Sequence, residues 1–458
     1  MSLGLEAMAP CFQGLFPATL FTCSADGIPN VAYLSHVDYV DADHVALSFQ
    51  FFNKSRRNIA ENPRGLVCVI DPDTRQCWRL KLHFVRSETT GPIFERMALR
   101  IEAIASYSGL KGIFKLLAAD IYEVLAVDAA PEEAPMQHAV AARHAPADAV
   151  FTTRALQDLA SCIQSADSLE QLLDSILAGI EKVFGFTQSM ILLPGEQDGV
   201  LVTIASRGYG EIGAGAEARF GEGIAGMVAE ARKPIRISGL MRGMLYALAV
   251  RKRAEEAGLC PQDRQIPMPG LSHPESQLGV PLLVRGELVG VLCIESEVPY
   301  RFHEEDKTAI ELLGSYLAIA IQNMLWRERS EAAEPEPPAT PTRDALPGVT
   351  PGRHHEIEFY GGDELIMVDG EYLIRSLPAR IFWKLLRLQR EGRTEFTNRE
   401  LRLDKTLNLP EWKDNLETRL LLLRRRLEQR CPNIRIVPRA RGRFALDMKC
   451  EVTLTERP

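Results

Sequence analysis

Two stretches that are poor in large apolar residues constrain this chain most, because neither can bury a core. Residues 129–149 are rich in Ala and Pro, and residues 327–353 are rich in Pro, Glu and Thr. The 458 residues also exceed what one hydrophobic core serves. We therefore expect three domains, at 1–128, 151–326 and 354–458, joined by linkers at 129–150 and 327–353, the second of which is disordered.

The charge is distributed unevenly over these three parts. The formal net charge is −8, yet the stretch from Pro351 to the end holds 22 Lys and Arg against 17 Asp and Glu. The negative charge therefore lies upstream of this stretch. A basic end on an acidic body predicts a separate module that binds a polyanion.

The nine cysteines are scattered and form no Cys-x-x-Cys pair, which favours a reducing compartment and gives no signature of a metal site. No apolar run approaches the roughly 20 residues that cross a bilayer. The N-terminus lacks the basic segment and apolar core of a secretion signal. These patterns predict a cytoplasmic protein.

The C-terminal part begins with short strands expected near 356–359, 364–368 and 372–375. Pro378 is placed to start a helix, and Thr397 followed by Glu400 fits a capping box for a short second helix. A third helix follows Pro410, and its leucines recur at spacings of 4, 3 and 4. These leucines predict a buried stripe formed by Leu416, Leu420, Leu423 and Leu427. The cations that fall mostly off this stripe are Lys413, Arg419, Arg426 and Arg430.

The sequence LRRRLEQR, followed by IRIVPRARGRF, resembles the tail and wing of the winged-helix effector domain of OmpR/PhoB-type response regulators. The resemblance implies that the third helix enters the DNA major groove and that the wing contacts the minor groove or backbone beside it. Leu421, Leu422, Ala440 and Arg443 depart from the family pattern, and the two leucines could meet another subunit. The DNA-binding candidates are Lys413, Thr418, Arg419, Arg424, Arg425, Arg426, Arg439, Arg441 and Arg443.

The segments RFGEGIAGMVAEARKPIRIS (219–238), SQLGVPLLVRGELVGVLCIES (276–296) and FHEEDKTAIELLGSYLAIAIQN (302–323) resemble a GAF domain. The resemblance implies an α/β sensor whose antiparallel sheet has a ligand pocket on one face and dimerising helices on the other. Gly221 to Gly226 also fits Gly-x-Gly-x-x-Gly, but no apolar strand leads into it, so a tight turn is favoured over a dinucleotide site.

The ligand of this sensor is not evident from the sequence. Pocket lids in the GAF fold come from the segment that corresponds to 239–276, and Cys260-Pro261 has the form of a haem-regulatory motif, although two residues do not suffice to predict haem. The pocket candidates are Met244, Tyr246, Cys260, Met268 and His273.

The helix expected from Glu304 to Trp326 carries an apolar stripe that permits two interpretations. The stripe either packs on the domain's own sheet or forms a seam between two copies of the chain. The residues concerned are Ile310, Leu313, Leu317, Ala320 and Met324.

The first part alternates short apolar runs with turns, which predicts a small antiparallel barrel with helices near 91–105 and 109–118. Residues 44–70 resemble the flavin-binding split barrel of pyridoxamine 5′-phosphate oxidase-like proteins. The resemblance implies that Lys54, Ser55, Arg56 and Arg57 hold the phosphate of FMN. The Arg and Lys that these oxidases carry on the preceding strand are missing, and Ser35 and His36 stand there instead. Both flavin binding and a barrel kept for dimerisation remain open.

These observations together predict a multidomain protein with an antiparallel β split barrel, an α/β GAF domain and an α+β winged helix. We expect a homodimeric transcription regulator that binds double-stranded DNA and responds to a small-molecule effector or redox state. One alternative is a flavin-dependent oxidase of the pyridoxamine-phosphate type with a regulatory GAF domain. Another is a C-terminal module that binds protein instead of DNA. No carboxylate pair, nucleophile–base motif or metal-binding spacing offers an independent catalytic route.

Overall fold

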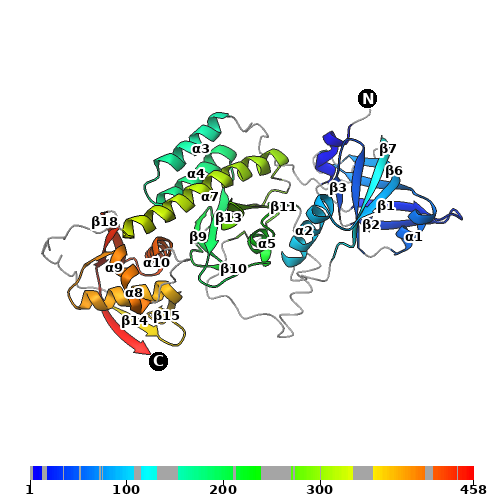
Figure 1. Cartoon of the computed structure of the whole chain (residues 1–458). Helices are drawn as coiled ribbons and strands as arrows, with labels where there is room; N and C mark the ends of the chain where they lie inside the picture. The colour runs from blue at the N-terminus through cyan, green and yellow to red at the C-terminus, as the bar shows by residue number, and fades with distance from the viewer. Residues whose placement is uncertain are drawn as a thin grey trace.

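A computed structural model shows three units that follow one another along the chain (Figure 1). The structure describes residues 4–12, 18–34, 36–50, 53–71, 74, 76–107, 115–130, 153–209, 213–238, 270–271, 274–299, 301–333, 354–407, 416–440 and 442–457.

The N-terminal unit is a seven-stranded antiparallel sheet in the order β2-β1-β5-β6-β7-β4-β3. Its strands alternate between the inside and the outside, as the period of two requires: Val67 and Val69 of β5 are buried while Leu66 and Cys68 are partly exposed. The elements are η1 (Leu5–Phe12), β1 (Ala18–Cys23), β2 (Pro29–Leu34), β3 (Val37–Tyr39), β4 (His44–Phe49), α1 (Asn53–Glu61), β5 (Arg64–Ile70), β6 (Cys77–Glu88), α2 (Pro92–Tyr107) and β7 (Ala118–Ala129).

One expectation for this unit is wrong, and it concerns the residues before β7. A helix was expected near 109–118, yet residues 115–117 are not helical and β7 begins at Ala118. Residues 108–114 lie outside the described part. β7 pairs with both β6 and β4 and so occupies an inner position in the sheet.

Helix α2 contributes to two cores. Met97 and Ile101 pack with Ala46, Ala119 and Ile121 of the barrel. Ala103, on another side of the same helix, packs in a cluster that otherwise consists of residues from the middle unit, around α5 and its sheet. The barrel and the middle unit are therefore joined through one shared helix, which lies between them in Figure 1.

The middle unit has a six-stranded antiparallel sheet in the order β10-β9-β8-β13-β12-β11. Helices α4 and α7 pack on the sheet, and α5 packs on strands β12 and β13. The elements are α3 (Thr153–Ser165), α4 (Leu169–Phe184), β8 (Gln188–Pro194), β9 (Val200–Arg207), β10 (Glu217–Arg219), α5 (Gly223–Ala231), β11 (Ile235–Ser238), β12 (Ser276–Val284), β13 (Glu287–Ser296) and α7 (Glu304–Ala333).

Local chemistry explains the boundaries in this unit. The Ser168 hydroxyl accepts a hydrogen bond from the Gln171 N–H and so starts α4 shortly after α3 ends at Ser165. The β12–β13 hairpin turns at Arg285 and Gly286, which both have positive φ and so match the right-handed twist of the two strands.

Helix α7 lies on its own sheet. Ile310, Leu313 and Leu317 are at most 1% exposed. The helix approaches β12 closely, because a Cβ added at Gly314 would lie 3.1 Å from Cγ1 of Val280. The predicted stripe therefore packs on the sheet of its own domain, which was the first of the two interpretations. The stretch Glu304–Arg327 is also long and apolar enough to cross a bilayer by length and composition.

The C-terminal unit has two sheets, in the orders β16-β15-β14-β20 and β17-β19-β18, around three helices. The final strand β20 pairs parallel with β14 from His354↔Glu451 to Tyr360↔Arg457, a pairing that the sequence analysis missed. The elements are β14 (His354–Tyr360), β15 (Leu365–Val368), β16 (Glu371–Arg375), α8 (Ser376–Arg390), β17 (Glu395–Thr397), α9 (Asn398–Leu403), η2 (Lys405–Leu407), α10 (Leu416–Arg430), β18 (Ile434–Ala440), β19 (Arg443–Met448) and β20 (Glu451–Arg457).

Candidate functional site

Helix α10 holds most of the predicted DNA-binding residues, and it is apolar on more than one side. The predicted stripe of Leu416, Leu420, Leu423 and Leu427 is buried at 0–5% exposure, as expected. Leu421 and Leu422, however, are also buried, at 2% and 5%. Leu422 lies with Val200 and Val202 of β9 around one small cavity, so it faces the middle unit. These two leucines, which favoured a contact with another subunit or protein, are thus buried within the chain itself.

Three arginines of α10 form ion pairs with acidic residues of the middle unit. Arg424 pairs with Glu170 in the first turn of α4. One turn further along α4, Asp174 Oδ1 lies 2.6 Å from Nη2 of Arg425. Nε of Arg419 lies 3.9 Å from Oε1 of Glu196, in the turn between β8 and β9. We call Glu170, Asp174, Glu196 and Glu217 the acidic face.

The remaining contacts of the acidic face are with the segment that starts α8. The backbone N–H of Leu377 donates to Oε1 of Glu196 at 3.0 Å. Arg375 stands at the N-cap position of α8, and its side chain makes no capping hydrogen bond to the helix. Its Nε donates instead to Oε1 of Glu217 at 3.2 Å. A helix N-terminus carries a partial positive charge, so the Glu196 carboxylate takes the place that an N-cap side chain usually fills.

Arg426 has a different role, because its partners lie inside the C-terminal unit. Its Nε donates to the carbonyl oxygen of Leu373 at 2.9 Å, and Nη2 donates to that of Tyr372 at 3.4 Å. Burial lowers the pKa of Arg426. This side chain ties α10 to the end of β16.

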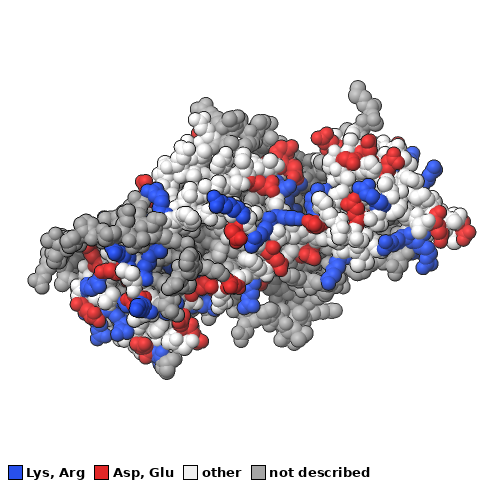
Figure 2. Space-filling view, in the orientation of Figure 1, with Lys and Arg blue, Asp and Glu red and all other residues white. Residues whose placement is uncertain are grey.

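The structure therefore corrects one expectation about the nine DNA-binding candidates. Arg419 and Arg426 were expected to lie off the buried stripe, but both are buried, because α10 is covered on its second side as well. Thr418 is also buried, and its hydroxyl has no hydrogen-bond partner among the described residues. In the view of Figure 2, basic and acidic side chains are interspersed over the C-terminal unit.

The hairpin β18–β19 provides the more accessible candidates. Arg439 is exposed and Arg443 is partly exposed, on either side of the turn at Gly442. Lys413 and Arg441 lie outside the described residues. Among the described candidates, Arg439 is exposed, Arg443 and Arg424 are partly exposed, and the other arginines of α10 are buried.

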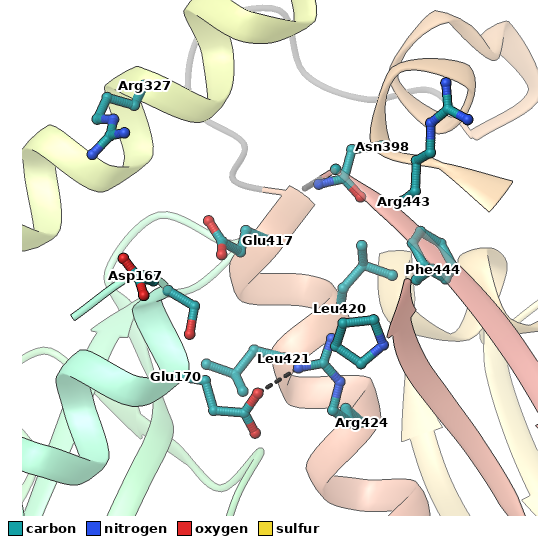
Figure 3. A pocket seen from close by; sticks show the side chains of 13 residues that line it. Asp167, Glu170, Arg327, Asn398, Glu417, Leu420, Leu421, Arg424, Arg443 and Phe444 are labelled. Carbon is teal, nitrogen blue, oxygen red and sulfur yellow. Dashed lines mark hydrogen bonds and ion pairs between the residues drawn. The ribbon is translucent and has the colours of Figure 1, made fainter. Parts of the chain in front are cut away.

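A cavity of about 500 Å³ lies where the middle and C-terminal units meet (Figure 3). Asp167 and Glu170 line it from the middle unit, and Glu417, Leu421 and Arg424 face them from α10. The dashed line in Figure 3 marks the ion pair of Arg424 with Glu170. The two units thus contact each other through ion pairs, and the cavity remains between those contacts.

The predicted flavin-phosphate residues lie in α1 of the barrel. Lys54, Arg56 and Arg57 are exposed, and the Arg56 guanidinium lies 4.5 Å above the ring centre of Phe49. Ser55 is buried and accepts a hydrogen bond from Nδ2 of Asn30 at 2.9 Å. Three cations on the first turns of a helix are suited to binding a phosphate group. Ser55, in contrast, already has a hydrogen bond with Asn30 of β2.

Burial shifts the pKa values of His36 and Asp120 in the barrel. His36, at a position where the oxidase family carries other residues, is buried, and burial with the nearby Arg100 and Arg96 holds its pKa well below the usual value. Burial raises the pKa of Asp120, to which Ser87 donates a hydrogen bond. Ser35 lies outside the described residues.

The middle unit holds a buried polar cluster at one end of its sheet. Glu295 of β13 is 6% exposed and accepts hydrogen bonds from the Leu271 N–H and from Nε2 of Gln277, at 2.9 and 2.6 Å. Burial raises the pKa of Glu295. The predicted pocket residues Met244, Tyr246, Cys260, Met268 and His273 all lie outside the described part. Within the described part, no group of three or more His, Cys, Asp or Glu residues could hold a metal ion.

Comparison with known proteins identifies the middle unit. Residues 166–322 match the family model of the GAF domain. The middle unit is a GAF domain. This supports a sensory or regulatory role for the chain, and it confirms that part of the sequence analysis.

Several solved structures are similar to one or another part of the chain. The GAF domain of the Acinetobacter phosphoenolpyruvate-protein phosphotransferase is 21% identical, covers 38% of this chain and 95% of its own, and has a TM-score of 0.31. The corresponding GAF domain from Coxiella burnetii is 23% identical, with coverages of 41% and 99% and a TM-score of 0.30. An FMN-binding protein from Syntrophomonas wolfei is 15% identical, with coverages of 28% and 93% and a TM-score of 0.23. None of the curated proteins matches this chain.

Proposed function

We propose that this chain is a cytoplasmic transcription regulator that binds double-stranded DNA through α10 and the β18–β19 hairpin and responds to a ligand of its GAF domain. The observation that supports this most is the order of elements in the C-terminal unit. A strand meander is followed by α8, a short capped helix α9, the arginine-rich helix α10 and a hairpin. A helix pair followed by a basic hairpin is the arrangement expected of a winged helix.

The residues suggest how such a unit would bind DNA. Arg439 and Arg443 flank the tight turn at Gly442, which has a φ of 67°, so the hairpin can bring two cations to adjacent phosphates. Thr418 and Arg419 would face base edges once α10 is uncovered, and Arg424 and Arg425 would contact phosphates.

The proposed sensor site is the polar cluster on the GAF sheet. Glu295 and Gln277 face each other across β12 and β13, and Tyr209 donates to the same carboxylate. The Oε1 atom of Gln277 is buried without a hydrogen-bond partner in the described part of the chain. A small molecule that donates a hydrogen bond would satisfy this acceptor.

We also propose that the chain forms a homodimer through α7. The face of α7 that points away from the sheet carries Leu312, Tyr316, Ile319 and Trp326, which are 41–66% exposed. Their spacings of 4, 3 and 7 place them along one side of the helix. Pairing with the same stripe of a second copy would bury them.

The experiment that tests DNA binding uses the full chain and a fluorescein-labelled pool of random duplexes of about 30 base pairs, at low ionic strength. We expect binding that weakens steeply with salt. Arg439→Ala combined with Arg443→Ala should weaken it at least about tenfold, because each phosphate contact removed lowers affinity and salt dependence. Arg207→Ala, which removes an exposed cation of the GAF domain, is the matched control. Binding that is absent, or equal in both variants, contradicts the proposal.

A second candidate function is flavin binding by the barrel, and the cations of α1 favour it. Lys54, Arg56 and Arg57 would hold the phosphate of FMN at the start of a helix. We expect the purified chain to take up FMN with a change in its visible spectrum, and Arg57→Ala to weaken that uptake. A chain that takes up no FMN excludes both a flavin sensor and the flavin-dependent oxidase.

A further inference from the structure

The acidic face of the GAF domain lies against the same residues that the proposed function assigns to DNA. Arg419, Arg424 and Arg425 each have a carboxylate of the GAF domain as a partner. The side chains of Arg419 and Arg425 are only 6% and 8% exposed. A phosphate cannot reach a guanidinium that is already paired and covered in this way.

The contact is apolar as well as ionic. Leu421 and Leu422 lie between the arginines in sequence and are buried with residues of the GAF core in one continuous cluster. Burying two leucines contributes several times more than one exposed ion pair. The leucines therefore supply attraction, while the carboxylates fix which side of α10 faces the GAF domain.

We propose that the acidic face is an intramolecular docking surface for α10, which competes with DNA and holds the chain in a closed state. This inference rests on the proposed function, since it concerns the regulation of the same helix. Opening requires that the contact between the GAF domain and the C-terminal unit separates. The apparent DNA affinity of the chain is then lowered in proportion to the fraction of molecules that are closed.

One ion pair at the start of α8 allows a test that leaves the DNA-binding candidates unchanged. Arg375 and Glu217 pair across the contact, and neither is assigned to DNA. Arg375→Glu places a carboxylate against Glu217 and should open the contact. The charge exchange Arg375→Glu with Glu217→Arg restores an ion pair of opposite polarity and should close it again.

The change in DNA affinity that we expect is opposite to what net charge alone would predict. Arg375→Glu makes the C-terminal unit more acidic, which by itself weakens attraction to DNA. We expect instead that it binds the labelled random duplexes about tenfold more tightly than the wild-type chain, and that the charge exchange returns the affinity to the wild-type value. Glu196→Gln should act in the same direction, because it removes the negative charge that faces the N-terminus of α8 and pairs with Arg419. Glu305→Gln, on an exposed site at the start of α7, is the control of equal charge change.

A second measurement separates failure of this inference from failure of the proposed function. Small-angle X-ray scattering of the free chain should give a larger radius of gyration for Arg375→Glu than for the wild type and the charge exchange. If Arg375→Glu neither expands the chain nor tightens DNA binding, the docking surface is refuted while salt-sensitive binding by the wild type keeps the proposed function. If the chain expands and no variant binds DNA, the proposed function fails, and the inference fails with it.

Discussion

Helices α1 and α10 both carry adjacent arginines, and the two helices differ in what surrounds those cations. In α1, Arg56 and Arg57 are exposed, and Ile59 is the buried apolar residue close to them. In α10, Leu421 and Leu422 precede the arginine run and are themselves buried against the GAF domain. A guanidinium on α10 is thus drawn into an interface by its apolar neighbours, whereas one on α1 stays in solvent.

The difference also concerns the opposite charges. The arginines of α10 meet Glu170 and Asp174 on the neighbouring domain. Arg56 rests on the ring of Phe49 within its own unit. Cations in a sequence therefore predict an anion partner, but the partner can be a carboxylate of the same chain or a phosphate of another molecule.

The largest effect that we expect comes from the leucines of α10. Leu423→Ala should lower the free energy of unfolding of the C-terminal unit by about 3 kcal/mol, because a fully buried side chain is removed and leaves a cavity. Urea unfolding monitored by Trp fluorescence measures this. Lys54→Ala on α1 is the control and should leave the midpoint unchanged. Equal urea midpoints for both variants would show that Leu423 of α10 contributes no more to stability than an exposed residue of α1.

The next largest effect on stability should separate Arg426, which is buried, from Arg57, which is exposed. Arg426→Ala should cost about 2 kcal/mol of stability, since the carbonyl oxygens of Leu373 and Tyr372 lose a buried donor. Arg57→Ala should have no measurable effect on stability. Thermal unfolding of both variants tests this difference, and an Arg426→Ala protein as stable as the wild type would show that the two hydrogen bonds to β16 contribute little.

A smaller effect is expected from a single ion pair across the contact. A double-mutant cycle of Asp174→Asn and Arg425→Gln should give a coupling energy of about 1 kcal/mol or less, because Asp174 is 58% exposed and water screens the pair. The stability of the full chain in urea is the measurement. A coupling of several kcal/mol would mean that the pair is far better shielded than its exposure indicates.

The smallest effect concerns α1. Millimolar inorganic phosphate should stabilise the barrel by roughly 0.5 kcal/mol if Lys54, Arg56 and Arg57 bind it weakly. The double variant Lys54→Ala and Arg57→Ala should lose this stabilisation. Sulfate-free thermal unfolding with and without phosphate provides the comparison, and stabilisation that persists in the double variant places the phosphate elsewhere.

The sequence predicted what depends on local chemistry. The capping box of Thr397 and Glu400 is present at the start of α9, as expected. It did not predict β20, because β20 pairs with a strand about 100 residues earlier and its alternation of Val452, Leu454 and charged residues is weak. Parallel pairing over such a separation leaves no local signal.

At the candidate site, too, contacts between residues far apart in the sequence could not be predicted. The buried stripe of α10 followed from its 3.6-residue period, but the period cannot say that a neighbouring domain covers the other side. Leu421 and Leu422 were the available signal, since two extra leucines on a cationic helix require a second apolar surface. The partner of that surface could not be deduced from α10 alone.

The position of helix α2 determines where the chain can be cut into fragments that fold well. Met97 and Ile101 pack in the core of the barrel, while Ala103 packs in the core of the GAF domain. A fragment that starts after the Ala/Pro-rich stretch would therefore expose the surface of α5 and β11 on which α2 packs. Such a fragment should be less soluble than one that begins ahead of Pro92. An exchange of the barrel for another module during evolution would have needed a replacement helix at this position.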